Sequence, residues 1–112
     1  MRRSTLAALA LLCGFASTHA RPARAQEASA SLTIRNHRFE PSTLTVKAGV
    51  KIVLSVTNAG TAPAEFESSE LNREKVIPPG TTAKIYVGPL EPGIYPFFDD
   101  FDQANRGQII AK

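Results

Sequence analysis

Carboxylates are the side chains of this sequence whose type and spacing could do chemistry. Glu65 and Glu67 stand on either side of Phe66, and an acidic run (DDFD) follows at 99–102. If residues 65–67 form a strand, both glutamates lie on one face, because successive side chains alternate. Carboxylate oxygens are hard donors that suit Fe(III), Mn(II), Ca(II) or Mg(II) better than Cu(I). The pattern therefore indicates either a ligand set for a hard cation or a solvated strand edge and acidic loop.

Other donors are scarce. His37 is the single histidine after residue 25, and that stretch contains no Cys and no Met. A type 1 copper site needs a thiolate and two imidazoles, so this composition argues against one. A lone histidine is usually a surface residue, but His37 would be the only nitrogen donor for a metal. Glu74 lies between Arg73 and Lys75, and we expect these cations to neutralise it in a salt-bridged loop.

Short strands must position these side chains. Stretches rich in β-branched or alternating residues predict strands at 30–34, 44–46, 51–57, 84–87 and 108–111. Gly, Pro and Asn mark turns at 48–49, 58–60, 78–80 and 91–93. We expect Val53 to face the core and residues 68–75 to form a loop or short turn. Short strands with regular punctuation predict an all-β sandwich or barrel.

The N-terminus has the features of an export signal. Basic residues at 2–3 precede an apolar run at 6–16, and Ala23-Arg24-Ala25 offers small residues for cleavage after Ala25. The apolar run is shorter than the roughly 20 residues of a membrane span. We therefore predict a signal peptide at 1–25, a mature domain at 26–112, a periplasmic location and no membrane span.

The leader also explains the basic charge. The chain has 13 basic and 10 acidic residues, for a net charge of +3, but four of the arginines lie in the leader and all the acidic residues follow it. The remainder is slightly acidic and has no basic patch, so we expect no nucleic-acid partner.

Most of the mature chain resembles a known family. Residues 39–41 (FEP), 44–49 (LTVKAG) and the stretch 53–58 that ends in Asn are similar to the opening of a cupredoxin. Residues 93–97 (GIYPF) and 107–110 (GQII) resemble its later strands. The resemblance implies an all-β, cupredoxin-like Greek-key β-sandwich.

The resemblance also implies where a metal would lie. Plastocyanin-like members carry His, Cys, His and Met ligands at one end of the sandwich, and in this sequence those positions fall on Glu65, Asp99, Asp102 and near Asn105. Carboxylates would thus replace the soft ligands, and copper, if bound, would not form a type 1 site. The candidate metal ligands are Glu65, Glu67, Asp99, Asp102 and His37.

A narrower resemblance points to iron. Residues 65–75 (EFESSELNREK) and 95–101 (YPFFDDF) are similar to small periplasmic cupredoxin-like proteins that accompany Ftr-type iron permeases, and more distantly to EfeO-type proteins. This implies an iron-uptake accessory that binds ferrous iron and helps to oxidise it. Its partners would be a periplasmic ferrous-binding protein, an iron permease and a membrane electron acceptor, because the domain has no acceptor of its own. Two alternatives stay open, a metal-free module that docks a partner protein and a sandwich without a site.

Overall fold

The computed structural model describes residues 10–19 and 27–112, and within them the chain is all-β. Residues 10–19 form neither helix nor strand, and no described helix is long and apolar enough to span a membrane. The cleavage site predicted after Ala25 lies outside the described residues. The strands are β1 (Glu27–Arg35), β2 (Arg38–Glu40), β3 (Thr43–Val46), β4 (Lys51–Asn58), β5 (Ala64–Ser68), β6 (Arg73–Ile77), β7 (Thr82–Val87), β8 (Gly93–Asp99) and β9 (Asp102–Ala111).

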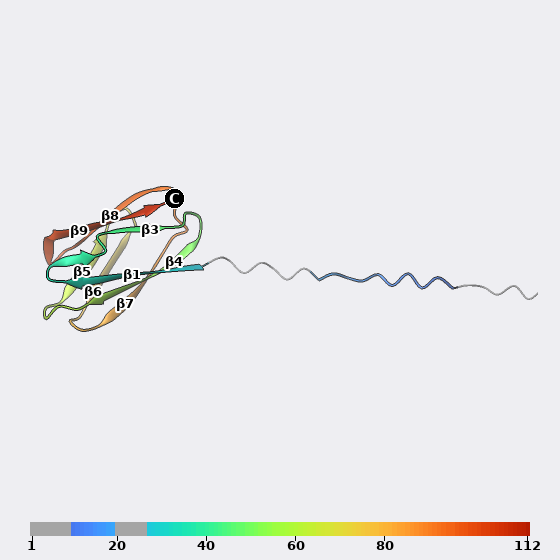
Figure 1. The fold of residues 1–112 in the computed structure, drawn as a ribbon, viewed down its shortest axis with the longest axis horizontal. Helices are drawn as coiled ribbons and strands as arrows, with labels where there is room; N and C mark the ends of the chain where they lie inside the picture. Colours follow the sequence, from blue (N-terminus) through green and yellow to red (C-terminus); the bar gives the residue numbers. More distant parts are fainter. Residues whose placement is uncertain (1–9, 20–26) are drawn as a thin grey trace, which may run out of the picture.

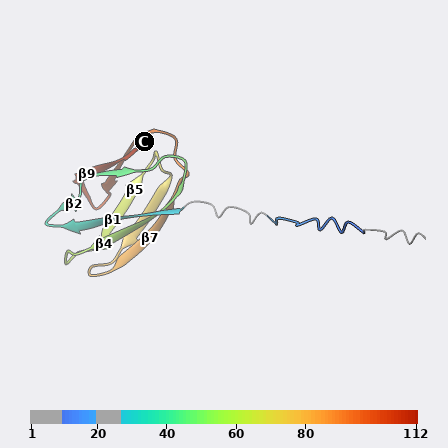
Figure 2. The same cartoon turned by 45° about the vertical axis from the view of Figure 1, so that its right-hand side comes forward.

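These strands form two sheets that pack face to face (Figures 1 and 2). A four-stranded sheet has the order β2-β1-β4-β7, and a five-stranded sheet has the order β3-β9-β8-β5-β6. Parallel pairing joins β1 to β4 and β3 to β9, while the other neighbours are antiparallel. The predicted all-β sandwich is thus confirmed.

Strand β4 shows how burial follows the period of the strand. Ile52, Leu54 and Val56 are at most 1% exposed and face the other sheet, whereas Val53 is only half-buried. The prediction that Val53 faces the core is therefore wrong by one residue. A one-residue change of phase exchanges the two faces of a strand, and the apolar run at 52–54 does not reveal its phase.

Three aromatic rings fill the centre of the core. Phe39 meets Phe66 and Phe97 edge-on, with ring centroids 6.3 Å and 4.8 Å apart, and Phe66 stacks on Phe97 at 5.1 Å. Gly107 on β9 makes room for them, since a Cβ atom there would overlap the Phe97 ring. The trio ties β2, β5 and β8 together beneath the candidate ligands.

Residues 68–75 are predicted to form a loop or short turn, and a turn does lie at 69–72, but 73–75 belong to a strand, so the stretch is part of a β-hairpin. Strand β5 ends at Ser68, a turn follows, and β6 begins at Arg73. The Ser68 hydroxyl accepts a hydrogen bond from the Leu71 backbone and donates one to the Pro96 carbonyl. Charged residues dominate the stretch because β6 is an edge strand, where charge discourages pairing with other chains.

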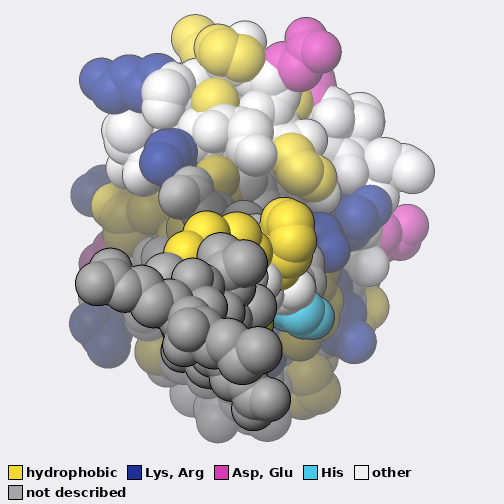
Figure 3. Space-filling view, turned by 90° about the vertical axis from the view of Figure 1, so that its right-hand side faces the viewer, with side chains coloured by type: hydrophobic (Ala, Val, Ile, Leu, Met, Phe, Trp, Pro, Cys, Tyr) yellow, Lys and Arg dark blue, Asp and Glu magenta, His cyan; other side chains and the backbone are white. Residues whose placement is uncertain are grey.

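The two ends of the sandwich differ in charge. The end at which β1 begins shows more Lys and Arg than Asp and Glu side chains (Figure 3). Lys51 opens β4 beside Glu27, and Lys112 follows β9 at the same end. The opposite end carries the β1–β2 turn, the β4–β5 loop and the β8–β9 turn, where the acidic run lies.

Candidate metal centre

Three carboxylates converge on the outer face of the five-stranded sheet. Glu65 and Glu67 lie on β5 with Phe66 between them pointing into the core, and Asp100 follows the end of β8. One oxygen from each of Glu65, Glu67 and Asp100 can be chosen so that all lie within 4.8 Å of one another. This spacing suits a single hard cation bound between them.

Hydrogen bonds between β5 and the end of β8 hold this arrangement. The Asp99 Oδ1 atom accepts the backbone N–H groups of Glu65 (2.9 Å) and Phe101 (3.0 Å). The Asp100 backbone N–H in turn donates to the Glu65 carbonyl at 2.9 Å. The β8–β9 register shifts between Phe98 and Asp99, and such irregularities re-aim side chains. Asp99 therefore acts as a buried clamp that places Asp100 beside Glu65.

The electrostatics of the cluster are those of crowded negative charge. The pKa of Glu65 is raised to about 7. The largest cause is hydrogen bonding with Glu74, followed by burial and by the negative charges of Glu74, Asp100 and Glu67. Burial, and then the charges of Asp100 and Glu74, also raises the pKa of Glu67. Within the described residues, the Arg35–Glu40 ion pair and the contact between His37 and Asp102 involve none of these carboxylates or of Glu74. Such a group binds a proton or a cation to relieve the repulsion.

Glu74 is a further member of this group, although its neighbours Arg73 and Lys75 predict a salt-bridged loop residue. It lies on β6, where it pairs with Glu67 across the hairpin. The expected neutralisation by its neighbours is wrong. The Arg73 guanidinium donates to the Tyr86, Leu71 and Asn72 carbonyls instead. Lys75 is one residue further along the strand and so faces the opposite side.

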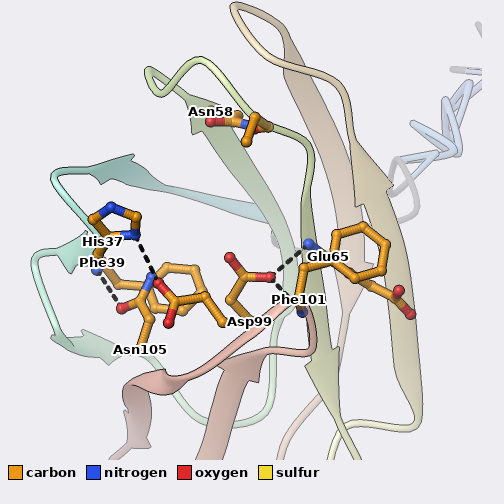
Figure 4. Close-up of polar contacts among 9 residues, drawn as sticks. His37, Phe39, Asn58, Glu65, Asp99, Phe101 and Asn105 are labelled. Atoms are coloured by element: carbon orange, nitrogen blue, oxygen red, sulfur yellow. Dashed lines mark hydrogen bonds and ion pairs between the residues drawn. The ribbon is translucent and has the colours of Figure 1, made fainter.

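The remaining predicted ligands lie around an open pocket at the end of the sandwich. His37 Nδ1 lies 3.0 Å from Asp102 Oδ2, and both residues line a hollow of about 560 Å³ together with Asp99. His37 stands in the tight β1–β2 turn, where it and Asn36 have positive φ, as short hairpin turns require. Figure 4 shows His37 on one side of Asp99, with the Glu65 carboxylate pointing away from both.

Two buried asparagines shape this pocket end. Asn105 Oδ1 accepts the Phe39 backbone N–H at 2.9 Å (Figure 4). Asn58 donates to the Ala62 and Ile77 carbonyls and accepts the Gly60 backbone N–H, which fixes the β4–β5 loop. Asn58 lines the pocket, and its amide is fully engaged by the backbone, so it serves the frame of the pocket. The buried Asn105 Nδ2 atom has no hydrogen-bond partner among the described residues.

The structure thus divides the predicted ligands into two groups. Glu65 and Glu67 meet Asp100 and Glu74 on the outer face of the sheet. Asp102 and His37 pair at the pocket, and Asp99 lies between the groups with its Oδ1 atom engaged by backbone N–H groups. The two-residue period of Glu65 and Glu67 predicts their shared face, while Asp100 and Glu74 depend on a strand register that the sequence does not display.

One curated relative shares much of the sequence. An uncharacterized protein of Rickettsia prowazekii is 42% identical over 82 residues, which is 72% of this chain. The match spans 66% of that relative's length, just under two thirds of it.

Solved structures share the fold at low sequence identity. Auracyanin A, a blue copper protein from Chloroflexus aurantiacus, matches with a TM-score of 0.66 at 9% identity and covers 78% of this chain and 100% of its own. A purple cupredoxin from Nitrosopumilus maritimus matches with a TM-score of 0.61 at 17% identity, and the match covers 74% of this chain and 99% of its own. The metal-binding domain of the Streptococcus pneumoniae Cu(I)-exporting ATPase CopA matches with a TM-score of 0.65 at 13% identity, and the match covers 75% of this chain and 84% of its own. These likenesses show the fold alone.

The sequence itself matches the family described as the cupredoxin-like domain over residues 5–111. Together with the two-sheet sandwich, this match shows that the chain belongs to the cupredoxin-like domain family.

Proposed function

We propose that this protein is a periplasmic iron-uptake accessory that binds iron at the carboxylate centre Glu65, Glu67 and Asp100 and hands it to a membrane permease. The observation that carries the proposal is the convergence of the three carboxylates within 4.8 Å. Their only ionic neighbours in the described chain are further carboxylates. A hard cation would neutralise this charge. Iron is the hard cation favoured by the resemblance of residues 65–75 and 95–101 to proteins that accompany Ftr-type iron permeases.

Oxygen ligands also favour a redox role. Carboxylates stabilise Fe(III) more than Fe(II), so they lower the reduction potential of bound iron and make its oxidation easier. Each Fe(II) that is oxidised gives up one electron, which a separate membrane acceptor takes. Copper bound to this chain would not form a type 1 site, because residues 26–112 contain no Cys and no Met.

The location and partners follow from the leader and the resemblance. The apolar run at 6–16 and the Ala-x-Ala motif at 23–25 support export to the periplasm. The strings shared with proteins that accompany Ftr-type permeases support action beside a ferrous-binding protein and the permease.

An anaerobic titration of the purified protein with Fe(II), monitored by calorimetry, tests the proposal. We expect micromolar binding by the natural chain and its loss in the Glu67→Gln, Asp100→Asn double variant. A matched control, Glu70→Gln with Glu91→Gln, removes the same charge from two exposed residues outside the cluster and should bind iron normally. Equal binding by the double variant and the control would reject the centre.

Docking of a partner protein is the alternative function. Phe101 is 56% exposed at the rim of the pocket beside Asp99 and Asp102, and an exposed aromatic ring with acidic neighbours is a common anchor at interfaces. If the chain bound no cation, loss of partner capture on Phe101→Ser substitution would support docking as its function.

A further inference from the structure

Glu74 is the side chain that the three-ligand centre leaves without a role. Its Cα atom pairs with that of Glu67 across β5 and β6, and directly opposed residues of an antiparallel pair share one face. Its carboxylate also lies beside that of Glu65 and raises the pKa of that group. Glu74 therefore faces the same patch of surface as the other carboxylates, although it comes from a different strand.

The position of Glu74 is not explained by charge pairing. Arg73 is held by three backbone carbonyls, of which the Tyr86 carbonyl on β7 lies 2.8 Å from Nε. The described ion pairs of the chain do not include Glu74. Two carboxylates opposite each other on neighbouring strands repel and destabilise the sheet, so this placement costs stability that a bound cation would restore.

The burial of Glu65 points to a ligand independently of the acidic grouping. Glu65 is 5% exposed, and its side chain meets no N–H donor or cation from the described residues. The groups that act on its carboxylate are the other carboxylates, Glu74, Asp100 and Glu67. A buried carboxylate normally has a hydrogen-bond donor, a cationic partner or a metal. Glu65 and Glu74 together thus form one wall of a cation site.

We propose that Glu74 is a fourth carboxylate ligand of the centre, and that its charge makes the centre prefer trivalent to divalent cations. This inference rests on the proposed function, because it concerns the same site. The attraction between one carboxylate and a cation grows in proportion to the cation charge, so Glu74 stabilises a trivalent ion about 1.5 times as much as a divalent one. Hard ions also take six or more oxygen ligands, which three residues supply only in part.

Two titrations of the full chain test the inference. Binding of Mn(II) is monitored by electron paramagnetic resonance, and binding of Tb(III) by luminescence. We expect Glu74→Gln to weaken Mn(II) by about tenfold and Tb(III) by about thirtyfold, because the loss of binding free energy scales with ion charge. The control is Glu70→Gln, an exposed acid in the turn of the same hairpin, which should change either affinity less than about twofold. A second variant, Glu74→Asp, keeps the charge but shortens the reach. It should also lose affinity if Glu74 is a ligand.

The outcomes separate the inference from the proposed function. If the natural chain binds both ions and Glu74→Gln binds them equally well, the fourth ligand is rejected and the three-residue centre stands. If Glu74→Asp retains full affinity while Glu74→Gln loses it, Glu74 acts through space and is not a ligand. If the natural chain binds neither ion nor iron, the centre itself is rejected. Urea unfolding of each variant shows that it is folded before it is titrated.

Discussion

The side chain of Asp99 holds the backbone of Glu65, with 2.9 Å between Asp99 Oδ1 and the Glu65 nitrogen. The same oxygen accepts the Phe101 N–H, and Asp99 is only 4% exposed. The cupredoxin ligand pattern makes Asp99 a ligand candidate, and the geometry gives its Oδ1 atom two backbone N–H groups to bind. The clamp therefore joins β5 to the β8–β9 turn beneath the candidate centre.

Substitution of Asp99 should separate structure from metal binding. Asp99→Asn retains a carbonyl oxygen for both N–H donors and should leave the fold and most of the metal affinity intact. Asp99→Ala leaves the buried Glu65 N–H and the part-buried Phe101 N–H without their partner, which costs roughly 1–3 kcal/mol of unfolding free energy. Urea unfolding and Mn(II) titration of both variants check this. If Asp99→Asn is stable but loses all metal binding, Asp99 is itself a ligand.

The metal-free protein should lose stability as the pH rises through neutrality. The fold raises the pKa of Glu65 from its ordinary value of 4.5 to about 7, so the folded state holds the proton more tightly than the unfolded chain does. The stability contributed by this proton is complete below pH 4.5 and is lost as the pH passes through about 7. Unfolding midpoints measured with a chelator at about pH 5 to 8 should fall, and Glu65→Gln should flatten the decline. A decline that survives unchanged in Glu65→Gln would assign it to another group.

Two substitutions on β4 test the phase of the strand. Leu54 is fully buried, so Leu54→Asp places an unpaired charge in the core and should prevent folding. Val53 lies on the outer face, so Val53→Asp should cost about 1 kcal/mol and leave a soluble, folded protein. Circular dichroism and gel filtration distinguish these results. Unfolding by Val53→Asp would show that the outer face is covered.

Gly107 should tolerate no side chain. A Cβ atom there would overlap the Phe97 ring and lie 2.6 Å from the Ser42 carbonyl oxygen. Gly107→Ala should therefore cost roughly 1–3 kcal/mol or more. Gly93 on β8 is the matched control, because its nearest neighbour would be 3.7 Å away. Thermal unfolding should show a clear loss for Gly107→Ala and little change for Gly93→Ala.

The sequence predicts the fold better than the site. The alternation of apolar residues and the Gly and Pro turns suffice for the strand at 51–58. For the strand at 102–111 they predict only its last part, 108–111. Strand β6 is missed because its REKVI sequence has one buried residue and reads as a charged loop. The short β2 is also missed, since three residues give no period.

For the site, local spacing reveals only contacts within one strand. Glu65 and Glu67 share a face by their two-residue separation, and the sequence predicts this pair. Asp100 joins them through the register of β5 with β8, and Glu74 through its register with β6. Cross-strand register is set by the hairpin turn and by the burial of Phe66, which a local pattern does not display.

The pairing of β5 with β6 also limits how the size of a bound ion could be tuned. Moving a carboxylate by one position along either strand transfers it to the opposite face. Moving it by two positions displaces it by about 6.8 Å, which exceeds the 4.8 Å within which the ligand oxygens now lie. No shift along the hairpin gives a small adjustment, so a slightly larger or smaller ion could be accommodated only by exchanging Glu for Asp in place.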